Sequence, residues 1–350
     1  MTVLSSASKK NFIVAACIIL LATAALLSGF VLSSKTVTVL RKTASLSPAE
    51  FRSLEPDVRL EAIERIASEK GIKEAQAMIR AAYPDEQNAD HELGHRIGEM
   101  AFQQSGFDGL AYCDASLAFG CFHGVAFAAV KKYGLRDDIA QKFWDGCQRQ
   151  TTPGNCLHGL GHAITVVKNY NLIPAFEECE RILTSDNDRF WCYDGVVMED
   201  ITRTLAGRQN PYASLTDPRA PCNTFPKKYE AVCVRNHITF VKERMSLSYE
   251  EMLELCESYA DGVTVRECVH MTGNAVAGSR QNPGDVINLC GNARSAYRQS
   301  CLEGGVVKFS MGGDFAHARE LCVTLDPGEA QQACFSKIDQ FKHERDTTDI

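Results

Sequence analysis

Residues 155–165, NCLHGLGHAIT, contain the pattern that decides the fold: a cysteine, a histidine two residues later, and closely spaced glycines. The same frame returns roughly every 35 residues, a period typical of two-helix repeats. Apolar residues recur at helical spacing, so we expect each such segment to begin a helix. The related segments are GCFHGVAFAAV (120–130), WCYDGVVMEDI (191–201), VCVRNHITFVK (232–242), ECVHMTGNAVA (267–277), SCLEGGVVKFS (300–310) and ACFSKIDQFKH (333–343).

Another cysteine precedes the cysteine of each segment by 8 to 13 residues, near the end of a preceding helical pattern such as DIAQKFWDGCQ (138–148). We therefore predict helical hairpins, each with a disulfide joining the end of one helix to the start of the next. A tight turn brings helix ends within the Cα separation of about 4.4–6.8 Å that a disulfide needs. The predicted pairs use 14 of the 15 cysteines: Cys113 with Cys121, Cys147 with Cys156, Cys179 with Cys192, Cys222 with Cys233, Cys256 with Cys268, Cys290 with Cys301, and Cys322 with Cys334.

An upstream segment, ADHELGHRIG (89–98), fits the same frame without a cysteine. The chain thus contains about eight hairpin units, and seven of them have a predicted disulfide. Stacked helical hairpins bury a continuous core between nearest neighbours. The predicted fold class is all-α, with helical-hairpin repeats forming either a solenoid or a closed α/α toroid.

The N-terminal region carries an uncharged stretch of 21 residues, FIVAACIILLATAALLSGFVL (12–32). As a helix, it is long enough to span a hydrocarbon core of about 30 Å. It predicts one transmembrane signal-anchor before the repeats, and a cleaved signal peptide is the alternative. The expected layout is a cytoplasmic tail (1–11), the anchor (12–32), a polar tether (33–45), an extracytoplasmic repeat domain (46–343) and a frayed tail (344–350).

The number of cysteines indicates the compartment of the protein, and its net charge limits the partners it can bind. Fourteen paired thiols favour an oxidising compartment, so we expect a single-pass membrane protein with a cytoplasmic N-terminus and a periplasmic or extracellular body. The net charge of −7, without any basic run, argues against nucleic acid. The expected partners are the membrane, through the N-terminal helix, and a peptide or protein on the repeat face.

Histidines concentrate at repeat-equivalent positions of the first three units. Two pairs have i,i+4 spacing, so each pair lies on one helix face. Imidazole is the commonest metal ligand near neutral pH, and several convergent histidines suit zinc or iron, with copper as a further candidate. The alternative is that they hydrogen-bond to nearby carbonyls or pack as half-buried polar groups. The predicted metal ligands are His91, His95, His123, His158 and His162.

Residues 91–95 read H-E-L-G-H, and the segment continues to Ala101. This stretch resembles the zinc-metalloprotease motif H-E-x-x-H-x-x-G-x-x-H, with Ala101 in place of the third histidine. The resemblance implies that His91 and His95 bind zinc and that Glu92 activates the bound water. Residues 158–162 have the same frame with Gly159 in place of glutamate, so repeat duplication also explains it.

The sequence favours a metalloprotein whose histidine cluster performs metal-dependent hydrolysis, or an iron-dependent oxygenase or hydroxylase reaction. Glu92 and Asp194 are the candidate catalytic bases. The competing hypothesis is a non-catalytic helical-repeat scaffold that binds a partner on its face. Recurrent glycines beside the histidines indicate either close helix packing or room for a ligand; they are Gly94, Gly124, Gly159, Gly161, Gly195 and Gly304.

Overall fold

The computed structural model describes residues 46–83, 91–114, 116–208, 214 and 216–347. This part of the chain consists of α-helices and short 3-10 helices and has no strand, which confirms the all-α prediction. The chain divides into two compact units, residues 1–82 and residues 83–350.

The smaller unit has three helices, α2 (Pro48–Arg52), α3 (Pro56–Lys70) and α4 (Ile72–Ala82). The Ser47 side chain accepts a hydrogen bond from the Glu50 backbone N–H, and the Glu50 carboxylate accepts one from the Ser47 backbone N–H. The two bonds form a capping box at the start of α2. Both α2 and α3 pack against α4.

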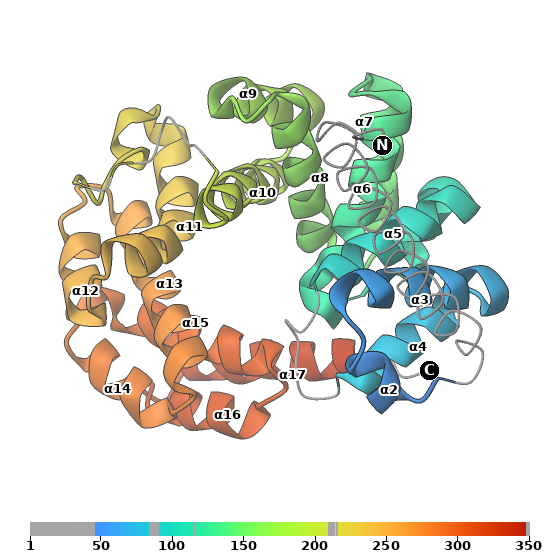
Figure 1. Ribbon diagram of the computed structural model, residues 1–350. Coiled ribbons are helices and arrows are strands. Elements are labelled where there is room, and N and C mark those ends of the chain that lie inside the picture. Colours follow the sequence, from blue (N-terminus) through green and yellow to red (C-terminus); the bar gives the residue numbers. More distant parts are fainter. Residues whose placement is uncertain (1–45, 84–90, 115, 209–213, 215, 348–350) are drawn as a thin grey trace, which may run out of the picture. The chain divides into compact units, whose positions relative to one another are not determined.

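The larger unit has a main series of eight long helices, each packed against the next (Figure 1). A set of shorter helices lies between them in the chain and packs against its neighbours in the series. The main series is α5 (His91–Ser105), α6 (Gly120–Tyr133), α8 (Pro153–Val167), α10 (Asp186–Leu205), α11 (Lys227–Met245), α13 (Gly262–Arg280), α15 (Ser295–Met311) and α17 (Glu329–Thr347). The intervening helices are η2 (Gly106–Tyr112), η3 (Ser116–Phe119), α7 (Asp137–Gln148), α9 (Leu172–Ile182), η4 (Cys222–Thr224), α12 (Tyr249–Glu257), α14 (Pro283–Gly291) and α16 (Phe315–Val323).

Local sequence signals begin many of these helices. A short polar side chain accepts a hydrogen bond from the first-turn backbone of five helices in the larger unit, which satisfies an otherwise unpaired N–H group. Proline occupies the first turn of α8 and α14, where its missing N–H costs nothing. The capping residues are Ser185, Ser248, Asp261, Asn282 and Asp314.

All seven predicted disulfides are present, with Cα separations from 5.2 to 6.0 Å. Each closes a short loop and contributes about 2–3 kcal/mol by restricting the unfolded chain. The bonds join Cys113 to Cys121, Cys147 to Cys156, Cys179 to Cys192, Cys222 to Cys233, Cys256 to Cys268, Cys290 to Cys301, and Cys322 to Cys334.

The position of the earlier cysteine differs from the prediction in two pairs. In five pairs this cysteine lies near the end of an α-helix, as expected. The exceptions are Cys113, which follows η2, and Cys222, which begins η4 directly after Pro221. The later cysteine of every pair lies in a helix of the main series: Cys121 in α6, Cys156 in α8, Cys192 in α10, Cys233 in α11, Cys268 in α13, Cys301 in α15 and Cys334 in α17. From α10 onward these helices begin more than one turn before the cysteine, whereas the sequence predicted that the cysteine segment begins the helix.

Three helix pairs of the main series are in backbone contact through glycine. In α5/α6, a Cβ on Gly98 would collide with the carbonyl oxygen of Cys121, and one on Gly124 with that of His95. The α8/α10 pair repeats this reciprocal arrangement through Gly161 and Gly195, and the α13/α15 pair through Gly273 and Gly304. The recurrent glycines at these positions therefore permit close helix approach. The solenoid or toroid stays a prediction.

The sequence predicted a single-pass membrane protein with a cytoplasmic N-terminus and a periplasmic or extracellular body. One finding contradicts this localisation. Among the described residues, no helix has both the length and the apolar composition that a membrane crossing requires. The longest, α10, contains seven acidic or basic side chains in its sequence DNDRFWCYDGVVMEDITRTL, whereas a spanning helix needs about 20 mostly apolar residues. The stretch that led to that prediction, residues 12–32, lies outside the described residues.

The domain layout drawn from the sequence stays a prediction. The tail (1–11), the anchor (12–32) and the tether (33–45) lie outside the described residues, as does the end of the 344–350 tail. Seven disulfides in the described part remain typical of proteins that fold in an oxidising compartment.

Candidate metal centre

The five predicted histidine ligands come from three consecutive helices of the main series. His91 and His95 lie one turn apart at the start of α5, and His123 lies in the first turn of α6. His158 and His162 lie one turn apart in α8. The glycine contact between α5 and α6, and the packing of α6 against α8, bring their rings together.

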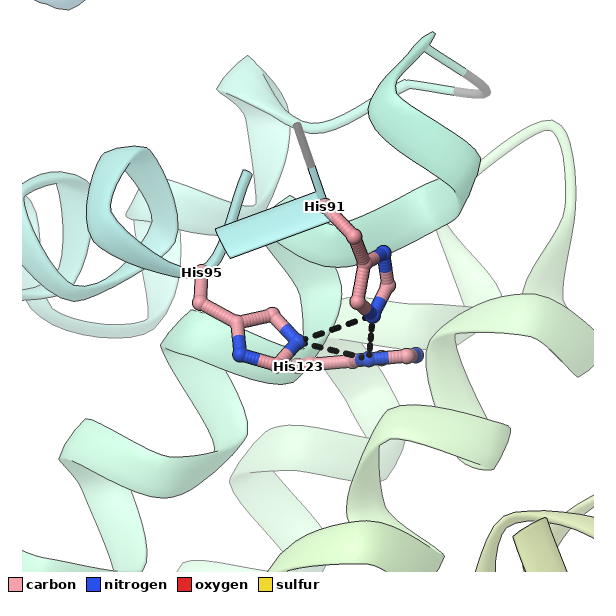
Figure 2. A group of neighbouring side chains, drawn as sticks. All are labelled: His91, His95 and His123. Atoms are coloured by element: carbon pink, nitrogen blue, oxygen red, sulfur yellow. Dashed lines mark hydrogen bonds between the residues drawn. The ribbon is translucent and has the colours of Figure 1, made fainter. Parts of the chain in front are cut away.

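The first group joins His91, His95 and His123 (Figure 2). His95 Nε2 lies 3.0 Å from His91 Nε2 and 3.1 Å from His123 Nδ1. His91 Nε2 lies 3.1 Å from His123 Nδ1, which completes a triangle of ring nitrogens. One ion can lie about 2.0–2.1 Å from all three if it sits outside their plane, which leaves its opposite side free for another ligand.

The backbone fixes the orientation of the His91 ring. His91 Nδ1 lies 3.0 Å from the carbonyl oxygen of Leu117, which can only accept, so Nδ1 donates and Nε2 keeps its lone pair. Leu117 and Phe119 have φ of 55° and 62°, a left-handed conformation that is uncommon for bulky residues. Such strain costs about 1–3 kcal/mol and clusters at functional sites.

The second group joins His123, His158 and His162, all three buried. One ring nitrogen from each lies within 4.8 Å of the others, and the Nε2 atoms of His158 and His162 are 2.9 Å apart. Both of these residues donate outward from Nδ1, His158 to Asp194 Oδ2 at 2.8 Å and His162 to Glu199 Oε2 at 2.8 Å. Carboxylates behind ligand histidines are the usual second layer of a metal site.

Burial disfavours the charged form of four of the five rings. It lowers the pKa of His91 and, together with the neighbouring imidazoles, lowers the pKa of His95 to about 3. Burial also holds the pKa of His123 and His162 well below the usual value. The imidazolium form is therefore disfavoured in these four rings, and a ring nitrogen that carries no proton can offer its lone pair to a metal ion.

Asp194 is fully engaged behind His158. Its Oδ1 accepts from Asn236 Nδ2 at 2.7 Å and lies 3.2 Å from Arg235 Nε, which in turn pairs with Glu267. Burial alone raises the pKa of Asp194, but the hydrogen bond with His158 and the Arg235 charge lower it to about 2. Both carboxylate oxygens thus face away from the Nε2 atoms, so Asp194 is placed to orient His158.

Glu92 also lies away from the ring nitrogens that face the cluster. Its side chain is 70% exposed, and its Oε2 lies 3.8 Å from His95 Nδ1, on the outward side of that ring. The metalloprotease resemblance is therefore limited to the spacing of His91 and His95. The third nitrogen of the group comes from His123 on α6, not from the position of Ala101.

The sequence singled out Asp194 and Glu199 as carboxylates near the histidines, but it predicted neither their contacts with the outward ring nitrogens nor the other groups that hold the site. The Leu117 carbonyl has no sequence signature, and Asn236 lies two helices beyond His158. Glu199 also accepts from the Tyr170 hydroxyl at 3.3 Å, and burial raises its pKa. Its position five residues after Asp194 on α10 is the one available signal, since both then lie on the helix that packs against α8.

No family model, no curated protein and no solved structure matches this chain. The site therefore rests on its own geometry: two groups of histidines that could hold metal ions, on an all-helical scaffold with seven disulfides.

Proposed function

We propose that this protein is a metal-dependent hydrolase in which an ion held by His91, His95 and His123 activates water. The triangle of ring nitrogens 3.0–3.1 Å apart is the observation that carries the proposal. Three histidines around an ion with one open position are a catalytic zinc arrangement that lowers the pKa of bound water to about 7.

The composition of this group favours hydrolysis over the iron oxygenase alternative. Iron oxygenases of the facial type use two histidines and one carboxylate, whereas all three nitrogens here are imidazole. Zinc and copper accept such a set readily. His91 and His95 are half-buried and His123 is buried, so the α5 side of the group is the less buried one.

Each residue then has a defined role. His91, His95 and His123 bind the ion, and the Leu117 carbonyl fixes the His91 ring. We assign Glu92 and Asp194, the candidate bases from the sequence, as positioning residues for His95 and His158, because each contacts the outward Nδ1. An ion held there would supply a water of lowered pKa as the nucleophile.

The test is metal-dependent turnover by the full chain. The protein is stripped with a chelator, reloaded with zinc, and assayed with p-nitrophenyl acetate and bis(p-nitrophenyl) phosphate. We expect zinc to restore hydrolysis, and His95→Gln to lower it at least 100-fold. His343→Gln, which changes an exposed histidine outside both groups, serves as the matched control.

Three outcomes contradict the proposal. Turnover that is equal in the His95→Gln variant and the control removes the site from the reaction. Oxygen consumption with ferrous iron, without zinc-dependent hydrolysis, favours the oxygenase. Failure to bind any metal leaves the scaffold hypothesis, in which the repeat face binds a peptide or protein.

We also propose that the larger unit is a solenoid of helical hairpins. The packing of the main series in chain order and the three glycine contacts support this architecture. Because each repeat contacts its neighbours only, unfolding by denaturant is expected to spread along the chain. Hydrogen exchange then shows protection lost separately in α5–α8 and α13–α17; loss in one concerted step contradicts the proposal.

A further inference from the structure

His123 is a member of both histidine groups. Its Nδ1 belongs to the triangle with His91 and His95. Its Nε2 is buried and has no hydrogen-bond partner among the described residues. An unsatisfied buried nitrogen of this kind costs about 1–3 kcal/mol, so it needs an explanation.

The second group lies against the His123 ring. The ring stacks on His162 with centroids 4.2 Å apart, and the centroid of His158 is 5.3 Å away. The outward Nδ1 atoms of His158 and His162 donate to carboxylates, which in a neutral ring leaves the lone pair on Nε2, and the two Nε2 atoms are only 2.9 Å apart. Two facing lone pairs repel unless a cation lies between them.

The charges around this second group suit a cation. Asp194 and Glu199 place two carboxylates directly behind its ring nitrogens. The first group has a backbone carbonyl behind His91 and an exposed glutamate behind His95. The second group therefore offers more negative charge and less solvent.

We infer that the five histidines form a two-ion centre in which the imidazole of His123 bridges a solvent-accessible ion at His91 and His95 and a buried ion at His158 and His162. The N–H bond of the neutral His123 ring breaks when the second ion binds. Its electron pair goes to that ion, and the proton leaves to solvent. This inference rests on the proposed function for its first ion.

The first test is metal stoichiometry with copper(II) as the probe. We expect two ions per full-length wild-type chain, and one per chain in both the His95→Ala and the His162→Ala variants. His343→Ala should retain two. One ion in the wild-type protein overturns the inference.

The second test is electron paramagnetic resonance, because an imidazolate bridge couples two copper(II) spins. The wild-type signal should account for less than its bound copper, whereas His162→Ala should show the full, uncoupled signal of one ion. Two ions with a full uncoupled signal contradict the bridge. His123→Ala should lose the coupling, and the two single-ligand variants keep the test decisive if His123→Ala does not fold.

The outcomes separate this inference from the proposed hydrolysis. Two coupled ions without turnover contradict the hydrolase and leave the bridge. Zinc-dependent turnover with one ion per chain contradicts the bridge and leaves the hydrolase.

Discussion

The helix pairs α5/α6 and α13/α15 share a backbone contact and differ in chemistry. Gly124 and Gly304 occupy equivalent places, each against the carbonyl of a histidine on the partner helix. The side chains around them are different. In the repeat frame of the sequence, His91, His95 and His123 of α5/α6 match His270, Asn274 and Glu303 of α13/α15, which form no metal-binding group in the described part of the chain. The glycine contact itself lies one turn further along α5, because Gly124 meets His95 and Gly304 meets His270.

The α8/α10 pair is intermediate, with His158, His162 and Asp194 at the same three positions. The glycines are constant across the three pairs while the polar residues change. The glycines therefore belong to the scaffold, and the histidines belong to the proposed site. This separation makes the effects of substitutions in the two regions predictable.

The largest expected effect tests the shared contact. Gly124→Ala and Gly304→Ala each place a methyl group against a backbone carbonyl, so each should lower the free energy of unfolding by about 3 kcal/mol. Gly291→Ala is the control, because a Cβ there has no neighbour within 4 Å. Denaturant unfolding of the metal-free proteins measures the effect, and only Gly124→Ala should also weaken metal binding. Equal stability of Gly304→Ala and the wild-type protein would show that the contact is not structural.

Metal removal tests whether the histidines of α5/α6 bind an ion that the residues of α13/α15 do not bind. Zinc at 100 times its dissociation constant should raise the free energy of unfolding by about 2.7 kcal/mol, and a chelator should abolish the gain. His95→Gln should lose most of it. Asn274→Gln changes the residue of α13 that matches His95 in the repeat frame of the sequence, and this variant should keep the full zinc-dependent gain in stability. A similar loss in both variants contradicts a site confined to the first pairs.

A substitution at Asp194 tests whether the carboxylate behind His158 contributes to metal binding. Asp194→Asn removes the charge that orients His158, and should weaken the metal affinity of the group formed by His123, His158 and His162 about 10–100-fold. Arg235 keeps its pairing with Glu267 in this variant. Glu303→Gln makes the same change at the equivalent position of α15 and should leave affinity unaltered, as measured by competition with a chromophoric chelator. Unchanged affinity in Asp194→Asn removes its positioning role.

The smallest effect concerns His270. Burial lowers its pKa to about 3; the charges of Arg235 and Lys337 act in the same direction, and a hydrogen bond with the Ser300 backbone opposes them. The unfolded chain therefore binds more protons below pH 6.5, and stability falls as the pH drops. Between pH 6.5 and 5 the contribution of His270 is about 1–2 kcal/mol.

The His270→Gln variant isolates this contribution. Its metal-free form should lose less stability over that pH range than the metal-free wild-type protein, as measured by urea unfolding at each pH. His343→Gln, which alters an exposed histidine, should follow the wild-type curve. Parallel curves for His270→Gln and the wild-type protein contradict the assignment.

The sequence by itself determined the helices, the seven disulfides and the identity of the five histidines. These follow from local rules: cap residues begin helices, apolar spacing sets the buried face, and cysteines 8 to 13 residues apart meet across one turn. The histidines could be found because a repeat places equivalent residues on one side of the stack.

Only the tertiary structure decided how the histidines divide and what orients them. The sequence placed all five near one point, whereas helix packing sorts them into two groups that share His123. It also moved Asp194 and Glu92 from candidate bases to contacts on outward ring nitrogens. Spacing along a chain reports which face a side chain occupies. The nitrogen that a ring presents depends on a partner such as the Leu117 carbonyl or Glu199, and packing between helices brings that partner within about 3 Å.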